Sequence, residues 1–135
     1  MSDLEQIRAY FANDRFASEG LGAVIEQAEP GHAVCRMEIQ PQHCNALGKP
    51  MGGAIFTLAD FAFAVAANAG QQPTVSLSSQ IAYLSTAKGN VLIAEARAVK
   101  RGRSTCYYQI DVSDELGTAV ACVTTTGFVM DKSKV

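Results

Sequence analysis

The chain has 135 residues, of which 48% are hydrophobic and 18% are charged, and its formal net charge at pH 7 is -2. This length and hydrophobic content predict one domain over residues 1–135 with a sizeable buried core. Because 11 Lys and Arg nearly balance 13 Asp and Glu, the chain as a whole offers no basic field for nucleic acid or an anionic membrane.

The first predicted element is a short amphipathic helix over about residues 3–16. Its apolar residues recur at helical spacing and should lie on the domain: Leu4, Ile7, Tyr10 and Phe11. The first twenty residues lack the basic, then apolar, then small-residue order of a secretory signal. We therefore expect a cytoplasmic protein.

A hairpin of two half-buried strands should follow this helix. Residues 21–29 lead into Pro30-Gly31, a strong turn signal. Residues 32–40 then alternate between two faces. One of these faces carries four side chains that can enter the core: Ala33, Cys35, Met37 and Ile39.

A buried helix is predicted from Gly52 to about Asn68, after a loop at residues 41–50. The helix is apolar all round, so the protein should enclose it. Asp60 is the only formally charged residue from Pro50 through Ala87. Since a charge in the middle of a bilayer is costly, we do not expect residues 51–69 to span a membrane.

Four further strands are predicted at residues 74–84, 90–100, 104–113 and 118–130. The breaks between them are short enough for each strand to pair with the next in antiparallel fashion. Tyr108, Ile110 and Val112 should face the core, which leaves Tyr107, Gln109, Asp111 and Ser113 outside. The elements together predict an α+β domain, in which an antiparallel sheet of five or six strands curls around one long apolar helix.

The cysteines do not indicate a metal site. They show no CxxC spacing, and the chain has only two histidines to join them. In the expected compartment they should be reduced, and we interpret all four as small buried hydrophobes: Cys35, Cys44, Cys106 and Cys122.

Asp60 admits two interpretations, because burying an ionised carboxylate without a partner is costly. In the structural interpretation, the carboxylate accepts backbone N–H bonds from a neighbouring loop. In the functional interpretation, it faces a dry cleft, where burial raises its proton affinity. Such a carboxylate is a useful general base or nucleophile near neutral pH.

Gly52 and Gly53 stand where the helix begins. The first N–H groups of a helix lack intrahelical partners and can bind an oxyanion, although tight backbone packing would explain the two glycines equally well. Asp60 lies eight residues after Gly52, about 12 Å along a helix. One chain cannot aim both at one carbonyl, but two antiparallel helices across a two-fold axis can, so an active site built from both predicts a dimer.

Asn45, Met51-Gly52-Gly53 and Phe56-x-Leu58-Ala59-Asp60 together resemble the hotdog-fold acyl-CoA thioesterases. The resemblance is strongest to the phenylacetate-degradation type and related thioesterase superfamily members, and it covers about residues 21–130. It implies a hotdog fold and hydrolysis of acyl-CoA to a free acid and CoA, without a metal or other cofactor. It also implies dimers that often pair into tetramers.

The resemblance further implies roles for four residues. Asp60 matches the general base or nucleophile, and Gly52 matches the residue whose N–H polarises the thioester carbonyl. Asn45 matches a side chain that holds the nucleophilic water or the thioester, and Ser76 matches a hydroxyl that positions water near Asp60. Many relatives have His where this chain has Met51, so one donor is lost here.

The substrate should contact residues close to Gly52 and Asp60. These are the expected contacts, although several are equally good core residues: Met51, Gly53, Phe56, Phe63 and Ala64. Lys100, Arg101 and Arg103 flank Gly102 and could pair with the phosphates of CoA. The alternative for these three cations is a solvated turn.

Two other functions stay open. One is acyl-CoA binding or sensing without catalysis, in which Asp60 is structural; Met51 makes it the stronger alternative. The other is hydration or dehydration of acyl thioesters on the same fold, which typically uses a His together with a carboxylate. The central helix holds no His, which argues against the second.

Overall fold

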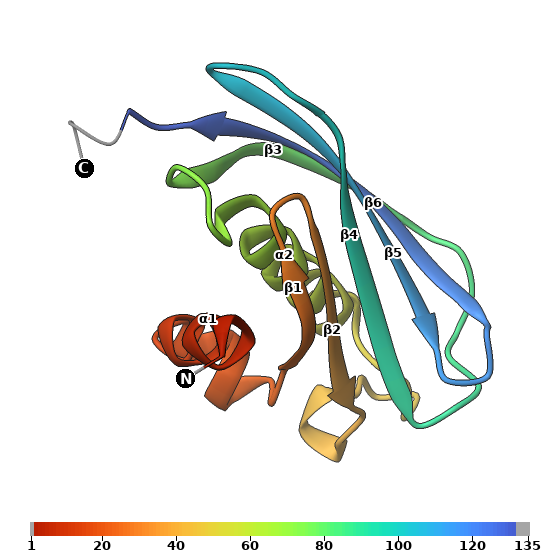
Figure 1. The fold of residues 1–135 in the computed structure, drawn as a ribbon. Helices are drawn as coiled ribbons and strands as arrows, with labels where there is room; N and C mark the ends of the chain where they lie inside the picture. Colours follow the sequence, from red (N-terminus) through yellow and green to blue (C-terminus); the bar gives the residue numbers. More distant parts are fainter. Residues whose placement is uncertain (1, 132–135) are drawn as a thin grey trace.

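In the computed structural model, which describes residues 2–131, a long helix lies against a six-stranded antiparallel sheet that curves around it (Figure 1). The predicted α+β architecture is confirmed. The elements follow one another in this order: α1 (Asp3–Phe11), a π-helical turn (Phe16–Gly20), β1 (Val24–Glu29), β2 (His32–Glu38), a 3-10 turn (Pro41–His43), α2 (Gly52–Asn68), β3 (Thr74–Tyr83), β4 (Val91–Arg101), β5 (Thr105–Asp114) and β6 (Ala119–Val129).

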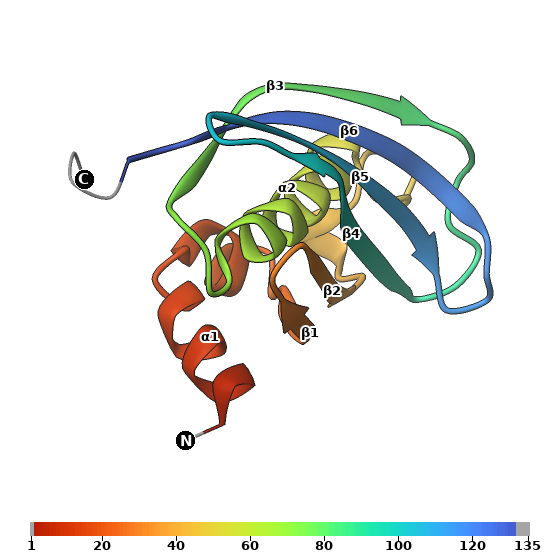
Figure 2. The same cartoon turned by 45° about the horizontal axis from the view of Figure 1, so that its top comes forward.

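The N-terminal helix is shorter than predicted, because α1 ends at Phe11 rather than near residue 16. Asn13 donates both its backbone N–H and its side-chain amide to the carbonyl of Tyr10, at 3.2 and 2.9 Å. Such local side-chain bonds compete with helix continuation. Figure 2 shows α1 on the side of α2 that the sheet leaves open.

The central helix has the predicted bounds and is buried largely through small side chains. Ala59, Ala62 and Ala66 have no exposed surface, and their size lets the helix lie close to the sheet. The expectation of burial all round is wrong on one face, where Thr57 and Asp60 are only half-buried. This face meets the segment that follows α1 rather than the sheet.

The strand order is β1-β2-β4-β5-β6-β3, and every neighbouring pair is antiparallel. The expectation that β3 pairs with β4 is therefore wrong. β3 pairs with β6 and forms an edge of the sheet, and residues 84–90 cross from this edge to β4. The sequence spacing is compatible with either arrangement, because a seven-residue connection can be a hairpin loop or a crossover.

Polar groups of the neighbouring strands hold this crossover, residues 84–90, in place. Leu84 donates its N–H to the carbonyl of Val120 at 2.8 Å. Lys88 and Gly89 donate theirs to one carboxylate oxygen of Asp114, at 2.8 and 3.0 Å. These N–H groups of the crossover therefore all have acceptors.

The core lies between α2 and the inner face of the sheet. Phe63 of α2 packs edge-to-face on Tyr108 of β5, with ring centroids 5.3 Å apart. Gly127 on β6 makes room for this ring, since an added Cβ would lie 3.1 Å from Phe63 Cζ. The inward-facing residues of β5 are the predicted ones: Tyr108, Ile110 and Val112.

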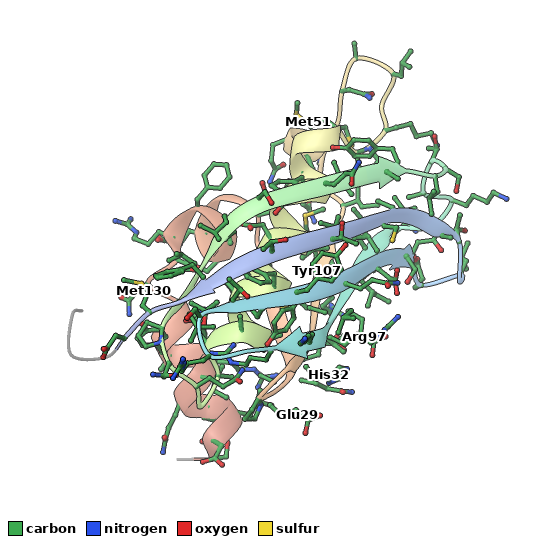
Figure 3. The ribbon with its side chains drawn as sticks, turned by 90° about the horizontal axis from the view of Figure 1, so that it is seen from above. Glu29, His32, Met51, Arg97, Tyr107 and Met130 are labelled. Atoms are coloured by element: carbon green, nitrogen blue, oxygen red, sulfur yellow. The ribbon has the colours of Figure 1, made fainter. Side chains whose placement is uncertain are left out.

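The outer face of the sheet is polar, as the alternation in β5 predicts. His32 Nε2 lies 2.8 Å from a carboxylate oxygen of Glu95, and Arg97 pairs with Asp111 at 2.6 Å. Figure 3 shows Tyr107, Arg97 and His32 on this part of the molecule.

The four cysteines are free. Cys35 and Cys106 are buried as predicted, whereas Cys44 and Cys122 are only half-buried. Burial raises the pKa of the Cys35 thiol to about 12, which makes it an unreactive core side chain. Among residues 2–131 no cluster of three His, Cys, Asp or Glu is placed to hold a metal ion.

The described part of the chain also contains no helix that is both long and apolar enough to cross a membrane.

Candidate active site

The central helix begins without a side-chain cap. Its N-cap residue is Met51, whose side chain makes no capping hydrogen bond. The Met51 carbonyl accepts the N–H groups of Ala54 and Ile55, at 3.0 and 3.2 Å. The N–H groups of Gly52 and Gly53 find no acceptor between residues 2 and 131, so they are free to bind a partly negative oxygen.

Tyr83, at the end of β3, explains why position 52 is a glycine. Its hydroxyl donates a hydrogen bond to the Gly52 carbonyl at 3.0 Å. A Cβ added to Gly52 would lie 2.7 Å from the Tyr83 oxygen, whereas one added to Gly53 would meet nothing closer than Met51 Cε at 3.9 Å. Tyr83 could not be predicted from the sequence, because only the placement of β3 brings it to the helix start.

A cavity of about 430 Å³ opens at this end of α2. The loop before the helix and the crossover form its walls, and Figure 3 shows Met51 at the start of α2. The structure thus brings Asn45 and Gly52 together and adds the cation of Lys49. The full lining is Asn45, Leu47, Lys49, Pro50, Gly52, Ile55, Tyr83, Leu84, Ser85, Thr86 and Ala87.

Asn45 fixes the loop in front of the helix. Its side-chain oxygen accepts the N–H groups of Leu47 and Lys49, at 2.9 and 3.2 Å. The side-chain NH₂ has no acceptor within the described residues and belongs to an exposed side chain. Asn45 can therefore donate a hydrogen bond into the cavity while its oxygen holds the loop.

His43 lies directly behind the helix start. Its carbonyl accepts the Met51 N–H at 2.9 Å, and its buried ring accepts the Gln40 N–H through Nδ1 at 3.0 Å. The ring is not part of the cavity lining. His43 therefore stabilises the loop but does not take the place of the His that many relatives have at position 51.

Asp60 is half-buried, and no donor of the described chain bonds to its carboxylate. Burial raises the pKa of Asp60 above its usual range, and the charge of Asp14 raises it further. The structural interpretation of this residue requires backbone N–H bonds to the carboxylate, and none of the described residues supplies one.

Asp60 lies in a second cavity, of about 250 Å³. No residue of this cavity also lines the cavity at Gly52. Within one chain, Asp60 and Gly52 therefore face separate spaces, as their spacing along α2 predicted. The lining of the second cavity is Asp14, Arg15, Phe16, Ala17, Thr57, Asp60, Phe61 and Ala64.

The five predicted substrate contacts lie in different surroundings, and Met51 and Gly53 are exposed at the helix start without lining either cavity. Ala64 lines the Asp60 cavity, and Phe56 is half-buried against the core. Phe63 lines neither cavity, because its ring is only 2% exposed and packs on Tyr108 in the core; its contact with a substrate stays a prediction. Phe61 lines the cavity in its place, and its helical spacing from Thr57 and Ala64 could have revealed this.

Ser76 lies on β3 opposite Gly127 of β6, beside a bulge in the pairing of the two strands. Its side chain is exposed and does not line the Asp60 cavity. The predicted role of Ser76 near Asp60 is not seen within one chain and stays a prediction.

The three cations near Gly102 differ in what they contact. Arg101 donates to the carbonyl of Ala67 and the hydroxyl of Thr74, both at 3.1 Å, so its guanidinium holds the C-terminal end of α2. Lys100 and Arg103 are exposed. All three lie at the end of α2 away from Gly52, about 24 Å along a 17-residue helix.

Comparisons with known proteins point to one protein family. Residues 48–121 match the family model of the thioesterase superfamily. The chain is 31% identical to acyl-coenzyme A thioesterase PaaI of Escherichia coli over 118 residues, which are 87% of this chain and 84% of that protein. It is also 31% identical to human acyl-coenzyme A thioesterase 13 over 94 residues, 67% of each chain.

Solved structures give the same result. The structure of E. coli PaaI superposes with a TM-score of 0.83 at 26% identity, covering 95% of this chain and 96% of that chain. A hypothetical thioesterase protein from Streptococcus pneumoniae, solved with coenzyme A, superposes with a TM-score of 0.82 at 28% identity. That alignment covers 89% of this chain and 96% of the other.

Proposed function

The chain belongs to the thioesterase superfamily, and from this premise we propose that it hydrolyses acyl-CoA thioesters to a free carboxylic acid and CoA. Relatives named acyl-coenzyme A thioesterase and a relative solved with coenzyme A support this substrate class. The observation that carries the proposal for the site is the unpaired, half-buried Asp60 on a helix whose N-terminal N–H groups are also unpaired.

In the proposed reaction, the thioester carbonyl oxygen accepts a hydrogen bond from the Gly52 N–H, which stabilises the negative charge that develops there. Ionised Asp60 of a second subunit either takes a proton from water, which attacks the carbonyl carbon, or attacks that carbon directly. The C–S bond then breaks, and CoA leaves as the thiolate. In the second route, water hydrolyses the resulting anhydride and regenerates Asp60.

We propose that a dimer assembles the site. β3 is a ten-residue edge strand with exposed apolar side chains: Val75 at 48%, Leu77 at 62% and Tyr83 at 54%. A long, apolar, unpaired edge is a pairing surface. Two β3 strands paired about a two-fold axis would continue the sheet and lay the two α2 helices antiparallel. From the family resemblance, we further expect such dimers to pair into tetramers.

The same dimer would distribute the contacts to CoA over both chains. Lys49 lies in the Gly52 cavity of one subunit. In an antiparallel arrangement, the end of β4 and the β4–β5 turn of the other subunit, which hold Lys100 and Arg103 near the C-terminal end of its α2, would extend past that cavity. We propose that these cations meet the phosphates of the nucleotide, whereas Arg101 remains with the C-terminal end of α2.

A non-catalytic acyl-CoA-binding function is the second candidate, because the N-cap residue Met51 supplies no side-chain donor. Hydration or dehydration is disfavoured, because α2 holds no His and the His43 ring lies outside both cavities.

The proposal is tested by measuring thiol release from a panel of acyl-CoAs, from acetyl through medium chains to phenylacetyl and hydroxybenzoyl, with Asp60→Asn as the matched variant. Turnover of one substrate class by the wild type but not the variant is the expected result. A folded dimer that binds acyl-CoA and releases no thiol from any of them would favour the binding function.

A further inference from the structure

The segment between α1 and β1 forms one wall of the Asp60 cavity and brings a second carboxylate to it. The titratable or charged groups that line this cavity beside Asp60 are Asp14 and Arg15, and no group of the sheet contributes to the lining. Arg15 is paired with Glu19. The cation is therefore engaged on its own segment, and Asp14 is the unpaired charge that faces Asp60.

Packing on both sides holds Asp14 at this wall. Phe11 packs edge-to-face on Phe61 of α2, with ring centroids 6.1 Å apart, and Ala17 is buried. The Asp14 N–H donates to the Phe11 carbonyl at 3.0 Å, and the Asp14 carbonyl accepts the Ser18 N–H at 2.9 Å. The backbone beneath the carboxylate is thus fixed relative to α2.

Two carboxylates that share one partly desolvated cavity oppose each other's ionisation. Asp60 is half-buried and Asp14 is exposed, so desolvation acts mainly on Asp60. No cation or N–H group of the described residues offsets the repulsion at Asp60. After burial, the charge of Asp14 is the second cause that raises the pKa of Asp60.

We infer that Asp14 is a positioning residue for the reaction proposed above: its negative charge on the wall of the shared cavity moves the pH range over which Asp60 serves as base or nucleophile to higher pH. The inference rests on the proposed function of Asp60. A carboxylate that holds its proton more strongly is a better base once ionised. In this view, the N-terminal segment tunes the chemistry of α2 in addition to covering the helix.

The test is the pH dependence of kcat/KM for the assembled wild type and Asp14→Asn. We expect the acid limb of the variant to move to lower pH, so that kcat/KM on the acid side rises, while the plateau changes by less than about threefold. Asp14→Lys should move the limb further in the same direction. Asp14→Glu, which keeps the charge, should stay close to the wild type.

Asp3→Asn is the matched control, because it makes the same chemical change on α1 but lies outside the Asp60 cavity. Its acid limb should coincide with that of the wild type. An unmoved limb in both Asp14→Asn and Asp14→Lys, or an equal shift in Asp3→Asn, would overturn the inference.

A readout without turnover separates this inference from the proposed function. The ¹³C resonance of the Asp60 carboxyl group, titrated in substrate-free protein, should show its midpoint at lower pH in Asp14→Asn than in the wild type. An unchanged midpoint would contradict the role of Asp14, even if Asp60→Asn is inactive. A shifted midpoint together with an active Asp60→Asn would overturn the catalytic role of Asp60 and leave only the coupling of the two carboxylates.

Discussion

Asp60 and Asp114 are both poorly exposed carboxylates, yet their surroundings are opposite. Asp114 is 2% exposed and sits among donors, whereas no donor of the described chain reaches Asp60. Burial alone would raise the pKa of Asp114, but backbone N–H bonds outweigh it and hold that pKa below its usual range. The residues whose N–H groups Asp114 accepts, at 2.8 to 3.0 Å, are Lys88, Gly89, Leu116 and Thr118.

A carboxylate that serves the fold is thus distinguished from one available for chemistry by the donors around it. Asp114 joins the crossover to the β5–β6 turn, and the crossover is a wall of the Gly52 cavity. Its burial is thus explained by the backbone that it holds. The burial of Asp60 has no such explanation, which supports a role in the reaction.

The largest expected effect is on the turnover of Asp60→Asn, which should fall by roughly 10²–10⁴-fold because a base or nucleophile is lost. The fold should remain. Ionising Asp60 is disfavoured in the folded state, so its raised pKa lowers stability as the pH rises through that pKa. Thermal unfolding should therefore show the variant at least as stable as the wild type at neutral pH, with the difference disappearing in acid. Full turnover in the variant would exclude Asp60 as the catalyst.

Gly52→Ala should lower turnover by roughly 10²-fold, since displacing reacting groups by about an ångström has that consequence. The added Cβ would lie 2.7 Å from the Tyr83 oxygen, so the Tyr83 side chain or the helix start must move and their hydrogen bond is disturbed. Gly53→Ala is the matched control, because its Cβ meets no atom closer than 3.9 Å. Steady-state kinetics should separate the two variants, and equal losses would contradict the specific role of position 52.

Asp114→Asn should act on stability rather than on chemistry, with a melting temperature several degrees lower at neutral pH. The contribution of Asp114 is present above the ordinary Asp pKa of about 4 and is lost as the pH falls through its lowered pKa. The melting curves of variant and wild type should therefore converge in strong acid. If the two melting curves coincide at neutral pH, Asp114 does not stabilise the protein by holding the crossover.

The smallest expected effect is that of Met51→His, which restores a donor beside Gly52. Turnover should stay the same or rise by a few-fold. If a folded variant loses turnover, the His side chain at the N-cap position disturbs the site and does not supply a useful donor.

The sequence predicted those parts of the fold that depend on local pattern. The apolar run and its terminal Asn68 predicted the bounds of α2, and alternation predicted the inward residues of β5. The pairing of β3 with β6 was missed, because the length of a connection does not say where it leads. The prediction that α2 is buried on all sides was wrong. The segment after α1 does not cover the face of Asp60 as tightly as the sheet covers the other faces.

The candidate site was predictable only to the same extent. Asn45 and Gly52 are close in sequence, and the structure places them in one cavity. Tyr83 lines the Gly52 cavity because β3 pairs with β6 at the edge of the sheet. Asp14 lines the Asp60 cavity because the N-terminal segment passes over α2. No local sequence pattern encodes either placement. Phe63 and Phe61 are two positions apart, and only the packing of Phe63 on Tyr108 shows which ring faces the sheet.

Subunit complementation can show whether the active site is shared between two chains. Asp60→Asn and Gly52→Ala proteins, each inactive as a homodimer, are dissociated, mixed in equal amounts and reassociated before thiol release is measured. Random pairing makes half of the dimers mixed, and each mixed dimer regains one intact site of two, so we expect about a quarter of wild-type turnover. If fully reassociated dimers recover no turnover, Gly52 of one chain and Asp60 of the other do not form one active site, and the proposed shared site is wrong.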